Sequence, residues 1–233
     1  SGTENSEGVE KLRQLAGEAH VRCEYADRVL KTISGKENCH AAVVFRKFED
    51  TLSQDRPHVV LHCPGDSGNV GTILRTALGF GYRDIALIRP CVDLFDPHTV
   101  RASMGSLFDL RLHVYDTFED YRMAYPSHYL YLFMLRQAIS MQAALEGQMP
   151  PTFALVYGNE GRGLPDTFSS LGQAVRIESN DRIDSLNLSI AAGIGMYAFA
   201  KKRGMLDDAS GSCKNAPGTS SEESTAGSSA PAV

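Results

Sequence analysis

From about residue 58 onward the sequence alternates between short apolar runs and helical patterns, and this alternation constrains the fold more than any other feature. Apolar runs predict strands at residues 58–63, 84–88, 112–115, 129–134, 153–157 and 174–177. Helical patterns fit residues 69–80, 97–104, 117–124, 137–146 and 185–203. Strands that alternate with helices are typical of parallel sheets. The sequence therefore predicts an α/β fold with a mostly parallel sheet flanked by helices.

The regions on either side of this alternation differ from it in character. Residues 1–8 are polar and are expected to be disordered. Residues 9–34 have apolar side chains at helical spacing and predict a helix, residues 41–45 predict a short strand, and residues 46–57 look like a connector. Residues 207–233 consist mostly of Ser, Gly, Ala, Pro and Glu. Such a segment buries too little apolar surface to offset its ordering entropy, which predicts a disordered tail.

Composition excludes several classes of protein. A hydrophobic content of 42% supports a full core, and a net charge of -5 argues against a nucleic-acid surface that covers the whole protein. No run is long and apolar enough to span a membrane, and the polar first thirty residues resemble no signal peptide. The chain has five widely spaced cysteines and no CxxC pair: Cys23, Cys39, Cys63, Cys91 and Cys213. This pattern favours a reducing, cytoplasmic setting without disulfides.

The histidines give no indication of a metal site. The seven histidines show no spacing that is typical of metal ligands, and structural or surface roles are expected for them. No metal site is therefore predicted. The aromatic and Met-containing run at 129–135 is interpreted as a core strand.

Three short polar segments lie where an apolar run meets a helical pattern. They are Gly68–Arg75 (GNVGTILR), Tyr157–Gly163 (YGNEGRG) and Ser185–Ser189 (SLNLS). In open α/β folds, ligands gather outside the carboxyl ends of the strands, so one site can draw on all three segments. Their glycines permit close backbone approach, and their Asn, Glu, Arg and Ser side chains supply polar groups.

Each segment also has a purely structural interpretation. Asn69 can cap the helix that it opens, and Asp184 or Ser185 can cap the last helix. The turn at 158–163 can be structural, with Glu160 on the surface, or Glu160 can hold a buried Arg75. Glycines at 65, 68 and 71 give GxxGxxG, so the GxGxxG fingerprint of a nicotinamide-dependent enzyme is absent.

Taken together, the three segments resemble the signature motifs of the SpoU/TrmH-like branch of the SPOUT RNA 2′-O-ribose methyltransferases. Those motifs read N-x-G-x-x-x-R, G-x-E-G-x-G and S-L-N-x-S, and their order and spacing agree with this chain. The matching residues are Asn69, Gly71 and Arg75; Gly158, Glu160, Gly161 and Gly163; and Ser185, Leu186, Asn187 and Ser189. The segment 100–108 resembles the stretch that this family places between its first two motifs.

The resemblance implies a SPOUT fold with a C-terminal trefoil knot over residues 58–205, S-adenosylmethionine as cofactor, and a homodimer. It implies that Gly158, Ile177, Leu186 and Ser189 bind the cofactor. It also implies that Arg75, Glu160 and Asn69 act in catalysis, with Glu160 orienting Arg75, and that Ser185, Asn187 and Arg162 bind substrate. Further basic contributors to an RNA surface are Arg101 and Arg182.

Two features depart from the family pattern. The family usually has Ile-Pro-Met after its penultimate strand, where this chain has Ile177-Glu178-Ser179. The family also often carries an N-terminal domain related to a ribosomal protein, and residues 9–50 resemble only the last part of such a substrate-binding domain. Because only part of that domain is matched, the resemblance specifies the reaction more closely than it specifies the RNA target.

The function that follows is methylation of a ribose 2′-hydroxyl in structured RNA, with ribosomal RNA favoured over transfer RNA. The alternative is a catalytically silent RNA-binding or ribosome-assembly factor on the same fold. Retention of Asn69, Arg75, Glu160 and Asn187 argues against that alternative. Because Arg stays protonated, Arg75 is expected to stabilise developing negative charge and not to act as a base.

Overall fold

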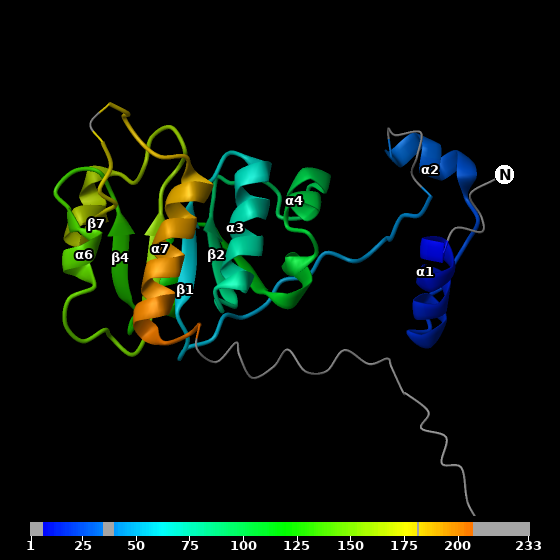
Figure 1. Cartoon of the computed structure of the whole chain (residues 1–233), viewed down its shortest axis with the longest axis horizontal. Coiled ribbons are helices and arrows are strands. Elements are labelled where there is room, and N and C mark those ends of the chain that lie inside the picture. The colour runs from blue at the N-terminus through cyan, green and yellow to red at the C-terminus, as the bar shows by residue number, and fades with distance from the viewer. Residues whose placement is uncertain (1–6, 35–39, 181, 207–233) are drawn as a thin grey trace, which may run out of the picture. The chain divides into compact units, whose positions relative to one another are not determined.

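The computed structural model describes residues 7–34, 40–180 and 182–206 (Figure 1). The chain divides into two compact units, an N-terminal unit (residues 1–48) and a sheet unit (residues 49–233), and each is described by itself. The tail expected at 207–233 and the first six residues lie outside the described residues. Within those described residues no helix has both the length and the apolar character that crossing a bilayer requires.

The N-terminal unit contains two helices, α1 (Glu7–Glu18) and α2 (Asp27–Ser34). The predicted single helix over 9–34 is wrong, because His20 has a left-handed φ of 54° and residues 21–26 are not helical. Glu7 and Gly8, expected to be disordered, belong to α1. The guanidinium of Arg13 lies 5.1 Å from the centre of the Tyr25 ring, which links the two helical regions.

The strand predicted at 41–45 is also wrong. Residues 40–48 have no regular secondary structure, and no described strand pairs with them. Val43 and Val44 are 76% and 92% exposed. A β-branched run favours a strand only when a neighbouring strand and a buried face are present, and this segment has neither.

A seven-stranded sheet forms the centre of the sheet unit, and every strand pair in it is parallel. The strands run in the spatial order β3-β2-β1-β6-β4-β7-β5. Their bounds are β1 His58–His62, β2 Asp84–Ile88, β3 Arg111–Tyr115, β4 Tyr129–Phe133, β5 Ile139–Ser140, β6 Phe153–Tyr157 and β7 Gln173–Arg176. The predicted mostly parallel α/β fold is confirmed.

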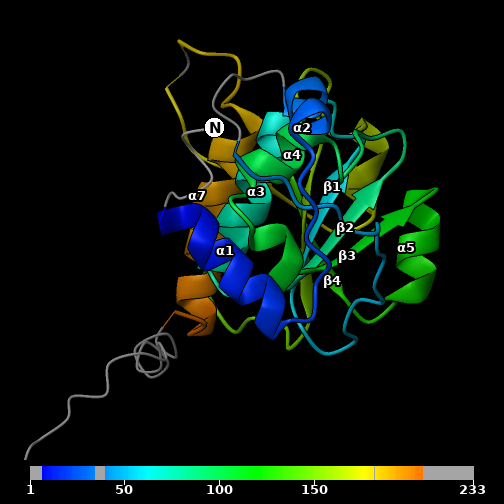
Figure 2. The same ribbon diagram turned by 90° about the vertical axis from the view of Figure 1, so that its right-hand side faces the viewer.

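Helices cover both faces of this sheet. Figure 2 shows α3 (Ser67–Gly79), α4 (Pro97–Ala102) and α7 (Leu188–Arg203) on one side of the strands and α5 (Phe118–Ala124) on the other. The remaining helical segments are α6 (Met141–Ala144) and the 3₁₀ turns Ser106–Asp109 and Asp166–Ser170. Strands β2 and β6 are buried along their whole length, as expected when helices cover both faces of a parallel sheet.

Helix α7 packs unusually close to the sheet. A Cβ added to Gly195 would lie 2.4 Å from the Tyr157 hydroxyl and 2.6 Å from Cζ of Phe133, so only glycine fits there. Two buried tyrosine hydroxyls donate hydrogen bonds to carbonyl oxygens of α7. Tyr82 donates to Met196 (3.2 Å), and Tyr157 donates to Ala192 (3.4 Å). These contacts fix both the depth and the axial position of α7.

Several element boundaries differ from the sequence prediction. The helix expected at 69–80 begins at Ser67 and is capped by Asp66, not Asn69. The last helix begins at Leu188 with Asn187 as its cap, not Asp184 or Ser185. The helix expected at 137–146 is replaced by the short β5 and α6. A trefoil knot is a property of the chain's path and not of its strand order, and it stays a prediction of the family resemblance.

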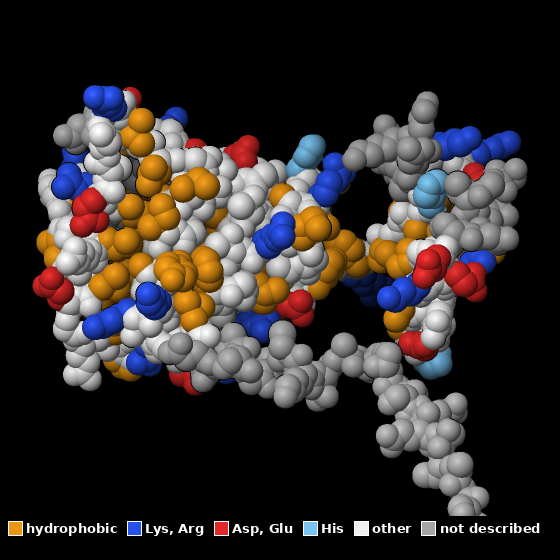
Figure 3. Space-filling view, viewed as in Figure 1, with side chains coloured by type: hydrophobic (Ala, Val, Ile, Leu, Met, Phe, Trp, Pro, Cys, Tyr) orange, Lys and Arg blue, Asp and Glu red, His pale blue; other side chains and the backbone are white. Residues whose placement is uncertain are grey.

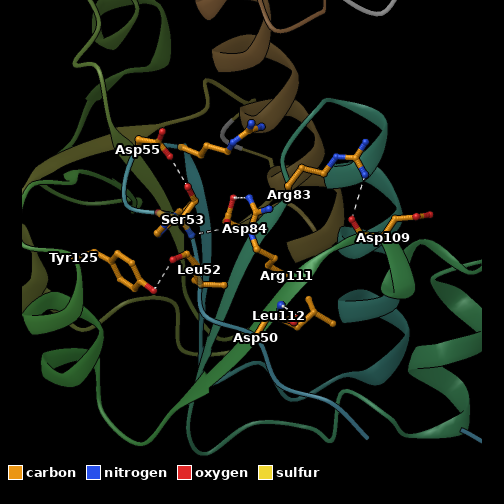
Figure 4. Close-up of polar contacts among 12 residues, drawn as sticks. Asp50, Leu52, Ser53, Asp55, Arg83, Asp84, Asp109, Arg111, Leu112 and Tyr125 are labelled. Carbon is orange, nitrogen blue, oxygen red and sulfur yellow. Dashed lines mark hydrogen bonds and ion pairs between the residues drawn. The ribbon is translucent and has the colours of Figure 1, made fainter. Parts of the chain in front are cut away.

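The segment that leads into β1 is fixed to the amino edge of the sheet by buried side chains (Figure 4). The Tyr125 hydroxyl donates to the carbonyl oxygen of Leu52 at 3.2 Å, and the Ser53 N–H donates to Oδ1 of Asp84 at 2.8 Å. Arg111 donates from Nε and Nη2 to the two Asp84 oxygens, each at 2.6 Å. This paired geometry compensates the burial of the Asp84 carboxylate, which is fully inaccessible.

His58, the first residue of β1, lies in the same region and is fully buried. Its Nε2 donates to the carbonyl oxygen of Ser53 at 2.7 Å, and its Nδ1 is 3.0 Å from the Tyr121 hydroxyl. Its ring lies 4.1 Å from that of His128. Burial, and then the neighbouring charge of His128, lowers the pKa of His58 from 6.5 to about 4.

We predict that the free energy of unfolding falls as the pH drops from 6.5 towards 4. Over this range the unfolded chain binds a proton at His58 and the folded chain does not. The free energy of unfolding should therefore fall by roughly 3 kcal/mol from its value above pH 6.5. Urea unfolding at several pH values measures this loss. His58→Gln should flatten the profile, whereas His98→Gln, at an exposed position, should retain it; equal slopes for both variants would refute the assignment.

Candidate active site

The candidate site lies at the carboxyl edge of the sheet, because all strands are parallel and their ends meet there. Four loops leave this edge next to one another: residues 63–66 after β1, 134–138 after β4, 158–163 after β6, and the described residues 177–180 and 182–187 after β7. Ligands of open α/β folds bind at this edge. The three polar segments of the sequence are therefore brought to one place, as predicted.

The carboxylate of Glu160 joins the first two segments. Its Oε1 accepts hydrogen bonds from the Asp66 N–H (3.1 Å) and Asn69 Nδ2 (3.3 Å). Its Oε2 accepts from the Gly65 N–H (3.0 Å) and Asn159 Nδ2 (3.2 Å). Each oxygen thus takes one backbone donor and one side-chain donor, from residues up to 95 positions away in the chain. Bonds to a charged acceptor are the stronger kind, so this carboxylate fastens one loop to the other.

Asn69 and Asn187 extend the same chain of hydrogen bonds to the third segment. Oδ1 of Asn69 accepts from Nδ2 of Asn187 at 3.2 Å. Oδ1 of Asn187 in turn accepts from the N–H groups of Ser189 (2.9 Å) and Ile190 (3.3 Å), which caps α7. The three signature segments are therefore one hydrogen-bonded unit.

A cavity of about 580 Å³ opens beside this network. Its wall comes from the ends of β4, β6 and β7, the loops that follow them and the start of α7. Phe133 and Tyr157, whose rings stack with centres 4.4 Å apart, form an aromatic part of the wall, and Leu188 adds an aliphatic side chain. The turn from Asn159 to Gly163 supplies the polar part.

The structure places the predicted site residues in two groups, on the cavity wall or outside it. Glu160, Arg162, Ile177, Ser185 and Leu186 line the cavity. The predicted residues that do not line it are Asn69, Arg75, Gly158, Asn187 and Ser189. Asn69 and Asn187 belong to the network described above, and Oγ of Ser189 donates to Oδ1 of Asn187 at 2.7 Å.

Gly158 has a reason of its own to be glycine. A Cβ at this position would lie 2.2 Å from the carbonyl carbon of Gly163 and 2.3 Å from the backbone nitrogen of Leu164. The two sides of the turn thus approach each other more closely than any side chain allows. The turn itself therefore requires glycine here.

Arg75 is not held by Glu160, so the expectation of a buried Arg75 paired with that carboxylate is wrong. Arg75 is exposed on the third turn of α3, and within the described residues no ion pair engages its guanidinium. Glu160 has its four donors elsewhere, as described above. The guanidinium of Arg75 is left available to a ligand from outside the chain.

Part of the cavity wall is not indicated by the sequence. Phe133, Met134 and Leu135 line the cavity, although the run 129–135 is predicted only as a core strand, and Arg136 in the loop that follows lines it as well. Asp166 and Ser179 also line it. The one available signal was position: a run that ends a parallel strand must reach the same edge as the motifs.

The cysteine beside the site is not activated. Burial raises the pKa of the Cys63 thiol, and the opposing effect of Arg162 is smaller. Its Sγ donates to the carbonyl oxygen of Arg89 at 3.4 Å. Nucleophilic thiol chemistry needs a lowered pKa, so Cys63 does not fit that role. In the described part of the chain, no group of three or more His, Cys, Asp or Glu side chains is arranged to hold a metal ion.

The parallel sheet, the cavity at its carboxyl edge and the hydrogen-bonded motif loops define an α/β domain of the ligand-binding kind. Residues 56–197 match the SpoU rRNA Methylase family. The chain belongs to that family.

Individual relatives agree with this assignment. The chain is 32% identical over 181 residues to the "Uncharacterized tRNA/rRNA methyltransferase slr1673" of Synechocystis, covering 75% of this chain and 65% of the relative. It is 26% identical over 205 residues to the "23S rRNA (adenosine(1067)-2'-O)-methyltransferase" of Streptomyces azureus, covering 84% and 76%. The AdoMet-bound rRNA methyltransferase of Sinorhizobium meliloti superposes with a TM-score of 0.68 at 26% identity, covering 83% of this chain and 78% of that one. Among the first curated relatives, the chain spans 26% of the length of one and 65% of another.

We predict that Glu160→Gln lowers the free energy of unfolding by about 2 kcal/mol, because an amide nitrogen in place of either oxygen leaves two N–H donors without an acceptor. Chemical unfolding by circular dichroism measures the change. The matched control is Glu178→Gln, at an exposed carboxylate in the loop after β7, which should change stability by less than about 0.5 kcal/mol. Equal effects of the two substitutions would contradict a fastening role for Glu160.

Proposed function

We propose that this protein transfers the methyl group of S-adenosylmethionine to the 2′-hydroxyl of a ribose in structured RNA, with ribosomal RNA favoured over transfer RNA. The observation that carries the proposal is the cavity bounded by the second and third signature segments, with the first segment bonded to its wall. Relatives with methyltransferase names support the same activity.

The residues of the cavity fit the cofactor. Its volume of about 580 Å³ lies within the roughly 300–1,000 Å³ of small-ligand sites. The half-buried ring of Phe133, which stacks on the buried ring of Tyr157, gives the wall an aromatic surface that suits an aromatic base, and the loops supply backbone polar groups. Of the residues implied to bind the cofactor, Ile177 and Leu186 line the cavity and are proposed as direct contacts. Gly158 and Ser189 are proposed to act by shaping the loops.

Bound S-adenosylmethionine supplies an activated methyl group, so the residues of this chain have three tasks. They align the two reactants, exclude water and stabilise the negative charge that develops on the ribose oxygen. The apolar wall serves the second task. Arg75 is proposed for the third, since a guanidinium does not act as a base at neutral pH but does stabilise an anion. Glu160 and Asn69 are proposed to act by fixing the loops, and Ser185, Arg162 and Asn187 by positioning substrate.

An RNA-binding surface must be local, because the net charge is -5. Arg75, Arg101, Arg162 and Arg182 are exposed, and among the described residues none of them has an ion-pair partner. Unpaired guanidinium groups suit phosphate, and binding through them should weaken with salt. The relatives' names refer to both rRNA and tRNA, so preference for rRNA rests on the partial resemblance of residues 9–50.

The alternative of a catalytically silent RNA-binding or assembly factor lacks a comparable observation. Such a factor needs no cofactor cavity, and the cavity and the residues of all three signature segments are retained here. A protein that binds no S-adenosylmethionine would favour this alternative.

We propose further that two copies of the chain associate through α7. Ile190, Ile194 and Tyr197 form an exposed stripe on this helix, 55%, 38% and 46% accessible, and Figure 3 shows the apolar surface along it. Burying such a stripe is favourable in proportion to its area. Sedimentation equilibrium tests this: Ile194→Glu should give monomers, while Met123→Glu on α5 should leave the mass unchanged. A monomeric wild-type protein would refute the proposal.

We predict that Arg75→Ala lowers methyl transfer by at least about a hundredfold, as removal of a group that stabilises transition-state charge does. Affinity for S-adenosylmethionine should change by less than about twofold, because Arg75 does not line the cavity. The measurement is a map of ribose 2′-O-methylation in RNA from cells with and without the gene, complemented by each variant, together with calorimetry. Arg122→Ala on α5 is the matched control, and it should restore the 2′-O-methylation that is lost when the gene is deleted. Rescue by Arg75→Ala, or its failure to bind cofactor, would refute this role.

A further inference from the structure

Asn159, the second residue after β6, uses every hydrogen-bonding group of its side chain. Its Oδ1 accepts from the N–H groups of Gly161 (3.0 Å) and Arg162 (3.2 Å). Its Nδ2 donates to the carbonyl oxygen of Cys63 (2.9 Å) and to Oε2 of Glu160 (3.2 Å). An asparagine amide has two donors and two acceptor sites, so all four are satisfied.

These four bonds have two different consequences. The acceptor bonds are local, and they close the turn together with the bond from the Gly163 N–H to the Asn159 carbonyl oxygen (2.9 Å). The donor bond to Cys63 spans 96 positions and ties the turn to the end of β1. Cys63 has a left-handed φ of 55°, a conformation that a residue other than glycine keeps only when its surroundings hold it. Asn159 is one of the groups that hold it.

The turn that Asn159 organises forms a wall of the cavity, since all residues from Asn159 to Gly163 line it. We infer that Asn159 is a positioning residue for cofactor binding: its amide fixes the turn 158–163 against the end of β1 and so preforms the cavity wall. This inference rests on the proposed function. Preformed walls raise affinity because less order has to be imposed when the ligand binds.

Three substitutions separate the two sets of bonds. Asn159→Ala removes both, and Asn159→Ser keeps a short acceptor for the turn but does not reach Cys63. Asn159→Asp keeps the acceptor and loses both donors when ionised, and its charge then faces the Glu160 carboxylate. The Glu160 carboxylate raises the pKa of the new carboxyl, the N–H groups of Gly161 and Arg162 lower it, and its protonated form regains one O–H donor.

The experiment is titration calorimetry of the full chain with S-adenosylmethionine between pH 5 and pH 8, below the unfolding temperature of each variant. Asn159→Asp should bind at least about tenfold more weakly than wild type at pH 8, since the ionised side chain loses both donor bonds, and it should regain affinity where the new carboxyl is protonated. Asn159→Ala should be weakened at every pH, and Asn159→Ser should lie between it and wild type. In turnover assays KM for the cofactor should rise with kcat little changed.

The matched control is Asn180→Asp, which makes the same charge change in the loop after β7. Oδ1 of Asn180 only accepts, from the Arg182 N–H at 3.0 Å, so aspartate keeps the bond and affinity should stay within about twofold of wild type. Affinity of Asn159→Asp that equals wild type at pH 8 would overturn the inference. Wild-type protein that binds no S-adenosylmethionine would instead overturn the proposed function, and the inference with it.

Discussion

The carboxylate of Glu160 is held by four N–H donors that come from both sides of the site. Two of them are the backbone amides of Gly65 and Asp66, in the loop that follows β1, and the others are side-chain amides. Loops at a sheet edge have few backbone partners of their own, so their shape depends on bonds of this kind. The carboxylate therefore joins the loops after β1 and β6, and this joins the wall of the cavity to the end of β1.

This network changes how the signature residues are understood. Asn69 and Asn187 bond to each other and, at their other ends, to Glu160 and to the first amides of α7. Their side-chain groups are largely occupied before any substrate arrives. Residues of this kind hold the loops of the site together, which is a role distinct from contact with the reacting atoms. Arg75 differs from the others, since its guanidinium takes no part in the network.

The parallel sheet could be predicted because its central strands are continuous apolar runs, such as Val59–Leu61 and Phe153–Val156, which helices bury on both faces. The grouping of the three motifs followed from the same fact. The break at His20 and the failure of the strand at 41–45 could not be predicted, because they depend on a local φ angle and on the absence of a partner strand. The donors to Glu160 could not be predicted either. Opposite charge favours a pair of Glu160 with Arg75, but a sequence does not indicate which backbone amides will point at a carboxylate.

Helix α7 connects the site to the rest of the molecule. Its inner face is pressed against Tyr157 and Phe133 at Gly195, and its first turn is capped by Asn187, which bonds to Asn69. Its outer face carries the exposed Ile190 and Ile194. Gly195 leaves no room for α7 to move inward and the tyrosine hydroxyls hold its carbonyl oxygens, so the position of the helix and of its cap is fixed relative to the sheet. An interface on the outer face of α7 would therefore lie on the same helix whose cap joins the network beside the cavity.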